Sequence, residues 1–270
     1  MPDIRPAAAE INGITMAYTD HGNGPALVLL HGHAYDRSMW DRQVELFTGQ
    51  GWRVVAPDLR GFGASGVTEG IVYTEEFADD VAALLDHLGI DRAVVVGFSM
   101  AGQIAMELVH RHPRSVRALV INDTVAEAED SAGKRRRHVT ADGILTGGME
   151  QYGRDVLGWM IAEYNVEAQP ETAARVLAML QNAPARGAAA AMRGRAERRD
   201  FTGLLPGLAI PVLVVVGADD AFDGGAGRRM AELVPGARLV VVDGAGHTPN
   251  LERPDAFDDA LGAFLGALPA

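Results

Sequence analysis

The chain has 270 residues, 48% of them hydrophobic and 22% charged, so it can bury a large core and does not have the composition of a disordered protein. Its formal net charge of -12 argues against nucleic acid as a partner, because phosphate binding needs a basic surface. The absence of cysteine excludes disulfides, zinc–thiolate sites and a cysteine nucleophile.

The N-terminal segment contains Asp3, Arg5 and Glu10 and no apolar run, which predicts neither a signal peptide nor a membrane span there. Apolar runs elsewhere, such as residues 209–217, are only as long as a strand. We therefore expect a cytoplasmic protein without a membrane partner, and we leave open whether it forms a homo-oligomer.

The predicted elements begin with an antiparallel hairpin or edge pair in residues 10–19, because Asn12-Gly13 is a typical hairpin turn. Six apolar runs follow, each ending in turn residues, and they lack the alternation of half-exposed strands. Strands that are buried on both faces, as in a parallel sheet, have this pattern. The six runs are residues 26–30, 53–57, 93–97, 117–121, 212–217 and 238–242.

Helical patterns lie between these runs. Apolar side chains recur at helical spacing in residues 74–88, and acidic residues lie in the first turn. Residues 100–110 and 254–265 predict two further helices. This alternation of strands and helices indicates an α/β fold with a mostly parallel sheet.

Strand patterns stop between residues 124 and 203, where apolar groups in residues 159–164 and 176–180 have helical spacing. They resume at Ile210-Pro211, so this segment interrupts the sheet rather than ending it. We therefore predict a core domain formed by residues 1–123 and 204–270, and a helical cap insertion formed by residues 124–203.

The strongest chemical signal is a serine turn, Gly97-Phe98-Ser99-Met100-Ala101-Gly102, between an apolar run and a helix. A serine in such a turn projects its hydroxyl above the sheet, and small residues two positions away on either side prevent clashes. Here the second of these small residues is alanine rather than glycine. A serine that only caps the helix is the alternative interpretation.

A nucleophilic serine needs a histidine base and an acid that orients the base. Asp219-Asp220 follows the run 212–217, and His247 follows the run 238–242. Ser99, an aspartate and His247 thus each come just after a strand, at the edge where open α/β sheets bind ligands. The sequence therefore predicts a serine nucleophile with a histidine base and an aspartate.

These motifs, together with His31-Gly32-His33 and the turn of residues 58–65, resemble those of the α/β-hydrolase superfamily over almost the whole chain outside the insertion. The chain is most similar to the small esterases, enol-lactonases and cofactor-free haloperoxidases of that superfamily. The resemblance implies an eight-stranded, mostly parallel sheet flanked by helices, with a helical cap inserted after the sixth strand. We expect no cofactor.

The resemblance also implies roles for individual residues. In these relatives the acid is usually the third residue after the strand-ending glycine, which favours Asp220 over Asp219. Asp123 is a rival for the acid, because some relatives use the corresponding position. The backbone amides of His33 and Met100 are expected to form the oxyanion hole, the pair of donors that stabilises the tetrahedral intermediate.

Two other patterns have both a structural and a functional interpretation. His31 and His33 could form a metal pair, but no carboxylate or cysteine cluster accompanies them, so we expect no metal and a structural His31. The basic clusters 134–137 and 193–199 are typical of a solvated helix face, although one arginine could hold a substrate carboxylate.

We expect Ser99 to attack a small-molecule ester or lactone and to form an acyl-enzyme, which water activated by His247 then hydrolyses. The same residues could instead serve a carbon–carbon bond hydrolase, a thioesterase, or a perhydrolase or haloperoxidase. A non-catalytic ligand receptor on a hydrolase scaffold is the alternative of a different class. Candidates for an apolar pocket wall, each of which could equally pack between cap and core, are Trp159, Met160, Tyr164, Met179 and Met192.

Overall fold

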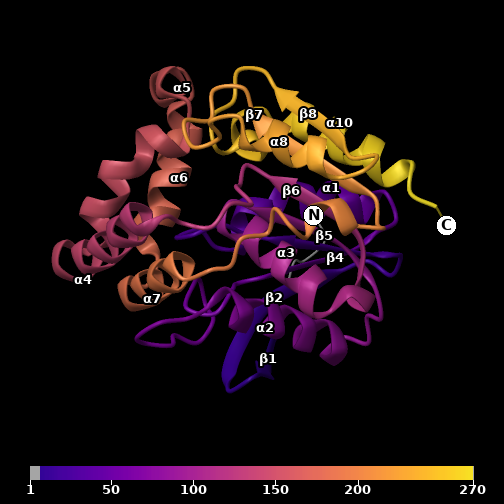
Figure 1. The fold of residues 1–270 in the computed structure, drawn as a ribbon, viewed down its shortest axis with the longest axis horizontal. Coiled ribbons are helices and arrows are strands. Elements are labelled where there is room, and N and C mark those ends of the chain that lie inside the picture. The colour runs from indigo at the N-terminus through magenta and orange to yellow at the C-terminus, as the bar shows by residue number, and fades with distance from the viewer. Residues whose placement is uncertain (1–6, 270) are drawn as a thin grey trace.

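The computed structural model describes residues 7–269 and contains an eight-stranded sheet in the order β1-β2-β4-β3-β5-β6-β7-β8 (Figure 1). β1 and β2 pair in antiparallel fashion at one edge, β2 is also antiparallel to β4, and the remaining pairs are parallel. This arrangement confirms the predicted fold class and the leading edge pair. The strands are β1 (Ala7–Ile11), β2 (Ile14–His21), β3 (Ala26–Leu30), β4 (Arg53–Pro57), β5 (Ala93–Phe98), β6 (Val116–Asn122), β7 (Val212–Gly217) and β8 (Arg238–Val242).

The central strands are buried on both faces, as their apolar sequences predict. Every residue of β5 and β7 is buried, because helices cover both faces of the sheet there. β8 differs from this prediction, since Arg238 is exposed and Val241 is 46% exposed. The physical reason is its place at the edge of the sheet, where a strand has a neighbour on one side only.

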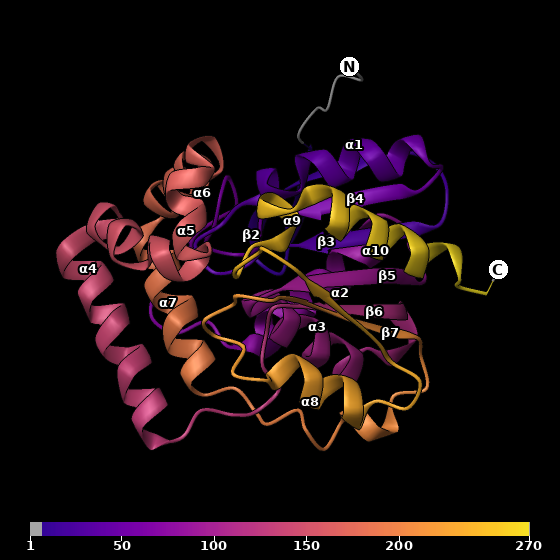
Figure 2. The ribbon, with the colours of Figure 1, turned by 90° about the horizontal axis from the view of Figure 1, so that it is seen from above.

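Helices pack on both faces of the sheet. On one face α1 (Asp41–Gly49) lies against α10 (Pro254–Gly266), and Arg42 Nε donates to Asp258 over 2.7 Å. On the other face α2 (Thr74–His87) lies against α3 (Met100–Arg111), and Arg111 Nε donates to Asp79 over 2.9 Å. Figure 2 looks onto the sheet through α10, with α2 and α3 behind it. The short α9 (Pro249–Glu252) precedes α10, and α8 (Ala226–Leu233) packs against β7.

Four helices occupy the chain between β6 and β7 and lie to one side of the sheet, at the left of Figure 1. The long α4 bends at Gly148, whose φ of 80° is not helical. No helix within residues 7–269 is both long enough and apolar enough to span a bilayer. The four helices, called the helical insertion below, are α4 (Ser131–Met160), α5 (Glu163–Ala168), α6 (Pro170–Asn182) and α7 (Ala185–Ala196).

Candidate active site

Ser99 lies in the turn between β5 and α3 with φ 53° and ψ -115°, a backbone conformation that side chains rarely adopt. Its amide donates to the carbonyl of Asn122 over 2.9 Å, which ties the turn to the neighbouring β6. A Cβ on Gly97 would lie 2.3 Å from the carbonyl oxygen of Ala101, so the turn requires glycine at this position. Ala101 is fully buried, and the turn accommodates its methyl group.

His247 lies in the loop that follows β8, and its Nε2 is 2.9 Å from the Ser99 hydroxyl oxygen. Glu252 shapes this loop from α9, because its carboxylate accepts hydrogen bonds from the amide of Gly246 over 3.0 Å and from other donors nearby. The imidazole packs against the rings of Phe98 and Phe222, with centroids 5.1 Å and 4.9 Å away. His247 is 4% exposed, so its orientation is fixed by packing on most sides.

Asp220 Oδ2 lies 3.0 Å from Nδ1 of His247, and Asp220 Oδ1 accepts from the amide of Phe222 over 2.9 Å. Burial acts to raise the pKa of Asp220, but His247 and the hydrogen bonds outweigh it and hold the pKa below its ordinary value. A carboxylate only accepts hydrogen bonds, so Nδ1 carries the imidazole proton and Nε2 is free to accept from Ser99. Asp219 is exposed and instead accepts from the hydroxyl of Tyr164 over 2.7 Å.

Asp123, the rival acid, lies beside Asp220 but does not contact the imidazole in the same way. Its Oδ1 accepts from the amide of Gly217 over 2.8 Å, and its Oδ2 has no hydrogen-bond partner within residues 7–269. Burial and then the negative charge of Asp220 raise the pKa of Asp123 well above its ordinary value. Of these two neighbouring carboxyl groups, Asp220 therefore favours the ionised form and Asp123 the protonated form.

The two amides expected to form the oxyanion hole stay candidates. Met100 is the first residue of α3, where an N–H has no acceptor within the helix. No backbone or side-chain acceptor within the described chain bonds the amide of His33. A Cβ on Gly32 would lie 2.8 Å from the Phe98 ring and 3.2 Å from Ser99 Cβ, so the segment before His33 packs directly against Ser99.

The imidazole of His33 is fixed by the helical insertion rather than by the core. Burial, with the positive charge of Arg195 nearby, lowers the pKa of His33 to about 3, so the ring is neutral. Its Nε2 lies 2.9 Å from the carbonyl oxygen of Ala188 and must carry the proton, and its Nδ1 then accepts from the Tyr152 hydroxyl over 3.3 Å. This side chain joins the loop after β3 to α4 and α7.

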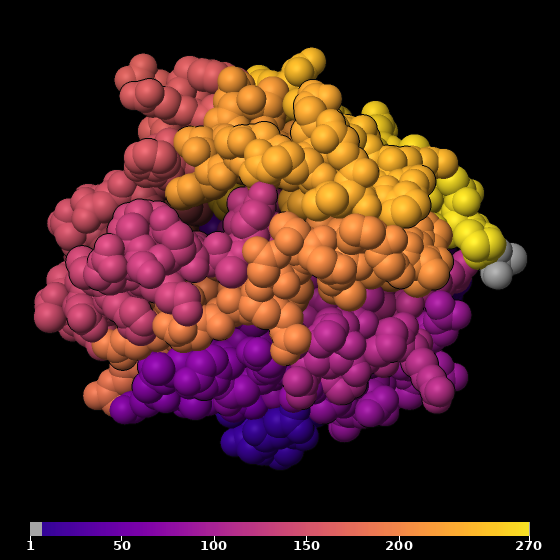
Figure 3. Space-filling view, in the orientation of Figure 1, coloured from indigo at the N-terminus to yellow at the C-terminus, as the bar shows by residue number. Residues whose placement is uncertain are grey.

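A cavity of about 470 Å³ lies between the helical insertion and the core, and Ser99 and His247 both line it. Figure 3 shows a hollow in the surface between the two parts. Its size is typical of sites that enclose a small organic ligand. The wall is largely apolar and includes Tyr35, Val125, Tyr152, Val156, Met160, Met192 and Phe222.

The predicted pocket wall needs correction at three of its five positions. Met160 and Met192 line the cavity, but Trp159, Tyr164 and Met179 do not. Trp159 is 53% exposed and its ring centroid lies 5.7 Å from that of Phe222, and Tyr164 is 51% exposed and bonded to Asp219. Met179, on α6, is buried against the segment before α1, where its sulfur accepts from Ser38 Oγ over 3.8 Å.

His31 has a structural place, and the metal alternative finds no support in its contacts. It is fully buried, its Nε2 accepts from the amide of Leu59 over 2.9 Å, and its Nδ1 lies 2.8 Å from the carbonyl oxygen of Gly32. The close cluster of possible metal ligands among the described residues is Asp123, Asp220 and His247. The hydrogen bonds between His247, Asp220 and Ser99 account for that cluster.

Some cavity residues were not singled out by the sequence, namely Gln103, Tyr152 and Phe222. Gln103 could have been found, because it lies four residues after Ser99 and so faces the same side of α3. Arg195 lies in a basic cluster from which no single arginine could be chosen. Tyr152 and Phe222 carry no local signal, since their positions depend on how α4 and the loop after β7 pack.

A family profile described as the alpha/beta hydrolase fold matches residues 25–254. The chain is 28% identical over 255 residues to 3-oxoadipate enol-lactonase 2 of Acinetobacter baylyi, covering 93% of each protein. A thermophilic esterase from Thermogutta terrifontis superposes with a TM-score of 0.94 at 32% identity, covering 98% of this chain and 100% of that one. The enol-lactonase from Burkholderia xenovorans LB400 gives 0.89 at 30% identity, covering 96% and 100%. The chain therefore belongs to the family of proteins with the alpha/beta hydrolase fold, and relatives named as esterases and enol-lactonases are similar to it over almost its whole length.

Proposed function

We propose that this protein is a serine hydrolase that cleaves carboxylic esters or lactones through an acyl-enzyme on Ser99. The observation that carries the proposal is one continuous chain of hydrogen bonds. His247 lies 2.9 Å from the Ser99 hydroxyl oxygen through Nε2 and 3.0 Å from Asp220 through Nδ1. The relatives named as esterases and enol-lactonases support the same reaction class.

In the first half-reaction the Ser99 oxygen attacks the carbonyl carbon, and its proton passes to Nε2 of His247. The negative charge of Asp220 stabilises the imidazolium that results. The carbonyl oxygen of the substrate becomes an oxyanion, and the amides of His33 and Met100 are the donors that we propose stabilise it. The tetrahedral intermediate collapses, His247 returns the proton to the leaving alcohol, and the acyl group stays on Ser99.

In the second half-reaction water attacks the acyl carbon while His247 accepts one of its protons. Collapse of the second intermediate returns that proton to the Ser99 oxygen and releases the carboxylic acid. With a lactone, the alcohol and the acid remain one molecule, and the product is a hydroxy acid or its keto form. A cavity of about 470 Å³ holds a small or medium acyl substrate.

The test uses p-nitrophenyl esters of increasing chain length, several lactones and a fluorophosphonate probe that labels activated serines. The unaltered protein is expected to hydrolyse part of this panel and to be labelled. Ser99→Ala should lose about 10⁴-fold or more in kcat, with no labelling and an unchanged circular dichroism spectrum. Ser131→Ala, at an exposed serine, is the matched control.

The same experiment separates the alternatives. Hydrolysis at a near-normal rate by Ser99→Ala would reject Ser99 as the nucleophile. Ligand binding without hydrolysis or labelling of the unaltered protein would support a receptor instead. Activity on carbon–carbon or thioester substrates, but not on any ester or lactone, would keep the nucleophile and change the substrate class.

A further inference from the structure

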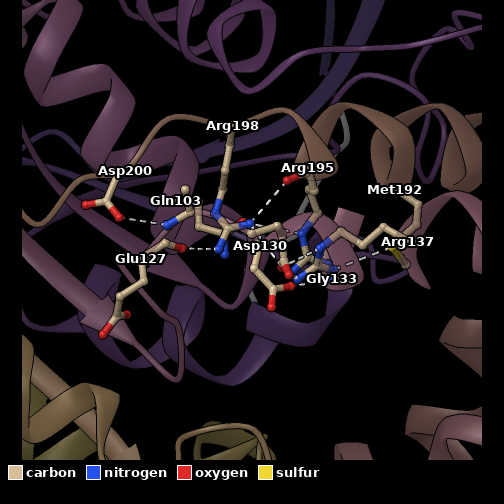
Figure 4. Close-up of polar contacts among 11 residues, drawn as sticks. Gln103, Glu127, Asp130, Gly133, Arg137, Met192, Arg195, Arg198 and Asp200 are labelled. Atoms are coloured by element: carbon tan, nitrogen blue, oxygen red, sulfur yellow. Dashed lines mark hydrogen bonds and ion pairs between the residues drawn. The ribbon is translucent and has the colours of Figure 1, made fainter. Parts of the chain in front are cut away.

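Arg137 and Arg195 line the cavity, and with Arg198 they form a cluster of three arginines (Figure 4). Arg137 on α4 donates to Glu129 through Nε over 2.6 Å. Arg198, just after α7, donates to the same carboxylate over 3.2 Å. Arg195 lies between them and has no carboxylate within ion-pair distance in the described chain. Three positive charges thus meet one negative charge, in a protein whose overall net charge is -12.

Arg195 is the least compensated of the three. Its one described hydrogen bond runs from Nε to the side-chain oxygen of Gln103, over 3.3 Å. Burial, together with the positive charges of Arg137 and Arg198, lowers the pKa of Arg195 well below its ordinary value. A guanidinium stays protonated in proteins even so, which means that an uncompensated positive charge is held at the cavity. Arg195 is half-buried at the cavity wall, where a charge without a partner is unfavourable, and a bound anion would reduce that penalty.

This charge lies close to the reacting groups. Gln103, which holds Arg195, is one helical turn, about 6 Å along the axis, from Ser99 on the same helix. The positive charge of Arg195 helps to lower the pKa of His33, whose amide is a candidate for the oxyanion hole. Arg195, Ser99 and His247 all line the one cavity. An anionic group bound at Arg195 would therefore belong to the same molecule that reacts at Ser99.

We propose that Arg195, with Arg137 beside it, binds a free carboxylate of the substrate, so that the preferred substrates are esters or lactones that carry a second, ionised carboxyl group. This inference rests on the proposed serine hydrolase function and specifies its substrate class. A planar guanidinium matches a carboxylate with two parallel hydrogen bonds. Glu129 balances only one of the three charges, so an excess of positive charge remains for the anionic group of a substrate. The apolar side chains Val156, Met160 and Met192 would contact the carbon chain between the two ends.

The test compares matched anionic and neutral substrates. Monoethyl succinate, glutarate and adipate are set against ethyl butanoate, pentanoate and hexanoate, with ethanol release as the readout. A second pair, 3-acetoxypropanoate against propyl acetate, carries the carboxylate on the alcohol side. The measured quantity is kcat/KM for the anionic ester divided by kcat/KM for its neutral match. The unaltered protein should prefer the anionic member in at least one of the two series.

Arg195→Gln should lower that ratio by about tenfold to a hundredfold, mainly through KM, because a hydrogen-bonded charge pair is lost. Arg195→Lys should recover part of it, since the charge remains without the planar fork. The matched control is Arg193→Gln, which removes a positive charge from the same helix at a residue paired with Asp142 outside the cavity. Its ratio should equal that of the unaltered protein. An Arg195→Gln ratio equal to that of the Arg193→Gln control would overturn the proposal.

Binding measured without turnover gives an independent readout. In the Ser99→Ala background, glutarate should raise the Tm above that in sodium chloride of equal ionic strength. The added Arg195→Gln substitution should abolish this increase, and a persistent increase would place the anion elsewhere. If the unaltered protein hydrolyses neutral esters but never prefers anionic ones, the carboxylate site is rejected and the hydrolase function stands. If it hydrolyses neither kind of ester nor any lactone, the proposed function itself fails.

Discussion

Replacing Asp220 by asparagine keeps the shape of the side chain and removes its charge. Its Oδ2 lies 3.0 Å from Nδ1 of His247, and both side chains are almost fully buried, so this carboxylate determines which ring nitrogen carries the proton. An amide nitrogen at that point donates to Nδ1, the proton moves to Nε2, and the Ser99 hydroxyl 2.9 Å away loses its acceptor. We expect kcat to fall about 10³- to 10⁴-fold, or about 4 to 5.5 kcal/mol in activation free energy.

Asp123→Asn is the matched variant, because it makes the same change at the buried carboxyl group beside Asp220. Because the pKa of Asp123 is raised by burial and by Asp220, its neutral form is favoured, and a neutral asparagine resembles that form, can still accept from the amide of Gly217, and tolerates the φ of 45°. We expect its kcat to stay within about threefold of that of the unaltered protein, because asparagine resembles the neutral form of the carboxyl group. The assay is kcat and KM for one p-nitrophenyl ester, after thermal melts have shown that both variants fold. Equal losses in the two variants, or a larger loss in Asp123→Asn, would refute this division of roles.

Three further predictions concern stability and backbone geometry. An unfolded aspartate has a pKa of about 3.9, and the folded-state pKa of Asp123 is raised, so the native protein loses stability as the pH rises above the unfolded value. The Tm of Asp123→Asn relative to the unaltered protein should therefore increase from pH 4 to pH 8. Glu252→Gln should lower the free energy of unfolding by about 3 kcal/mol, because an amide turns a donor toward groups such as the Gly246 N–H. Gly97→Ala should lower it by about 1 to 3 kcal/mol and reduce kcat, because the new Cβ would lie 2.3 Å from the Ala101 carbonyl oxygen.

Each of these has its own control and its own contrary result. A Tm difference that does not change with pH would mean that Asp123 is ionised in the folded protein. Glu232→Gln, at an exposed residue of α8, should leave denaturant unfolding unchanged, and Glu252→Gln must differ from it. Gly207→Ala adds a Cβ with nothing within 4 Å, and equal kcat and stability in both glycine variants would argue against a tight turn at Ser99.

The sheet could be predicted because each strand carries its own signal, a short apolar run that ends in turn residues. The exposure of β8 could not, since its sequence is as apolar as that of the buried β7 and only the strand order puts it at the edge. α1 was not predicted, because Arg42, Gln43 and Glu45 interrupt its apolar pattern. Gln43 is buried through a hydrogen bond to Asp258, a contact from the far end of the chain.

That the side chains of Ser99, Asp220 and His247 meet could be predicted for a topological reason. In a parallel sheet the carboxyl ends of the strands lie at one edge, so polar residues after β5, β7 and β8 must come near one another. The pocket wall has no such rule, because α4 bends at Gly148 and its two halves present different faces to the core. Trp159 and Met160 are neighbours in sequence, yet Trp159 is 53% exposed and Met160 is the one that lines the cavity. Which arginine faces inward is equally a matter of packing.

Glu252 also limits which helical insertions from other hydrolases could replace the one in this protein. Besides the loop of His247, its carboxylate accepts from the amide of Ala162 over 2.9 Å and from the side chain of Asn165 over 2.7 Å, both of which come from the helical insertion. A chimera that carries the corresponding helices of another hydrolase would leave this buried carboxylate short of donors unless the graft supplied both groups at the same places. Exchange of the insertion to alter substrate range should therefore keep residues 161–165 with the recipient, since the loop that carries His247 is held partly through them.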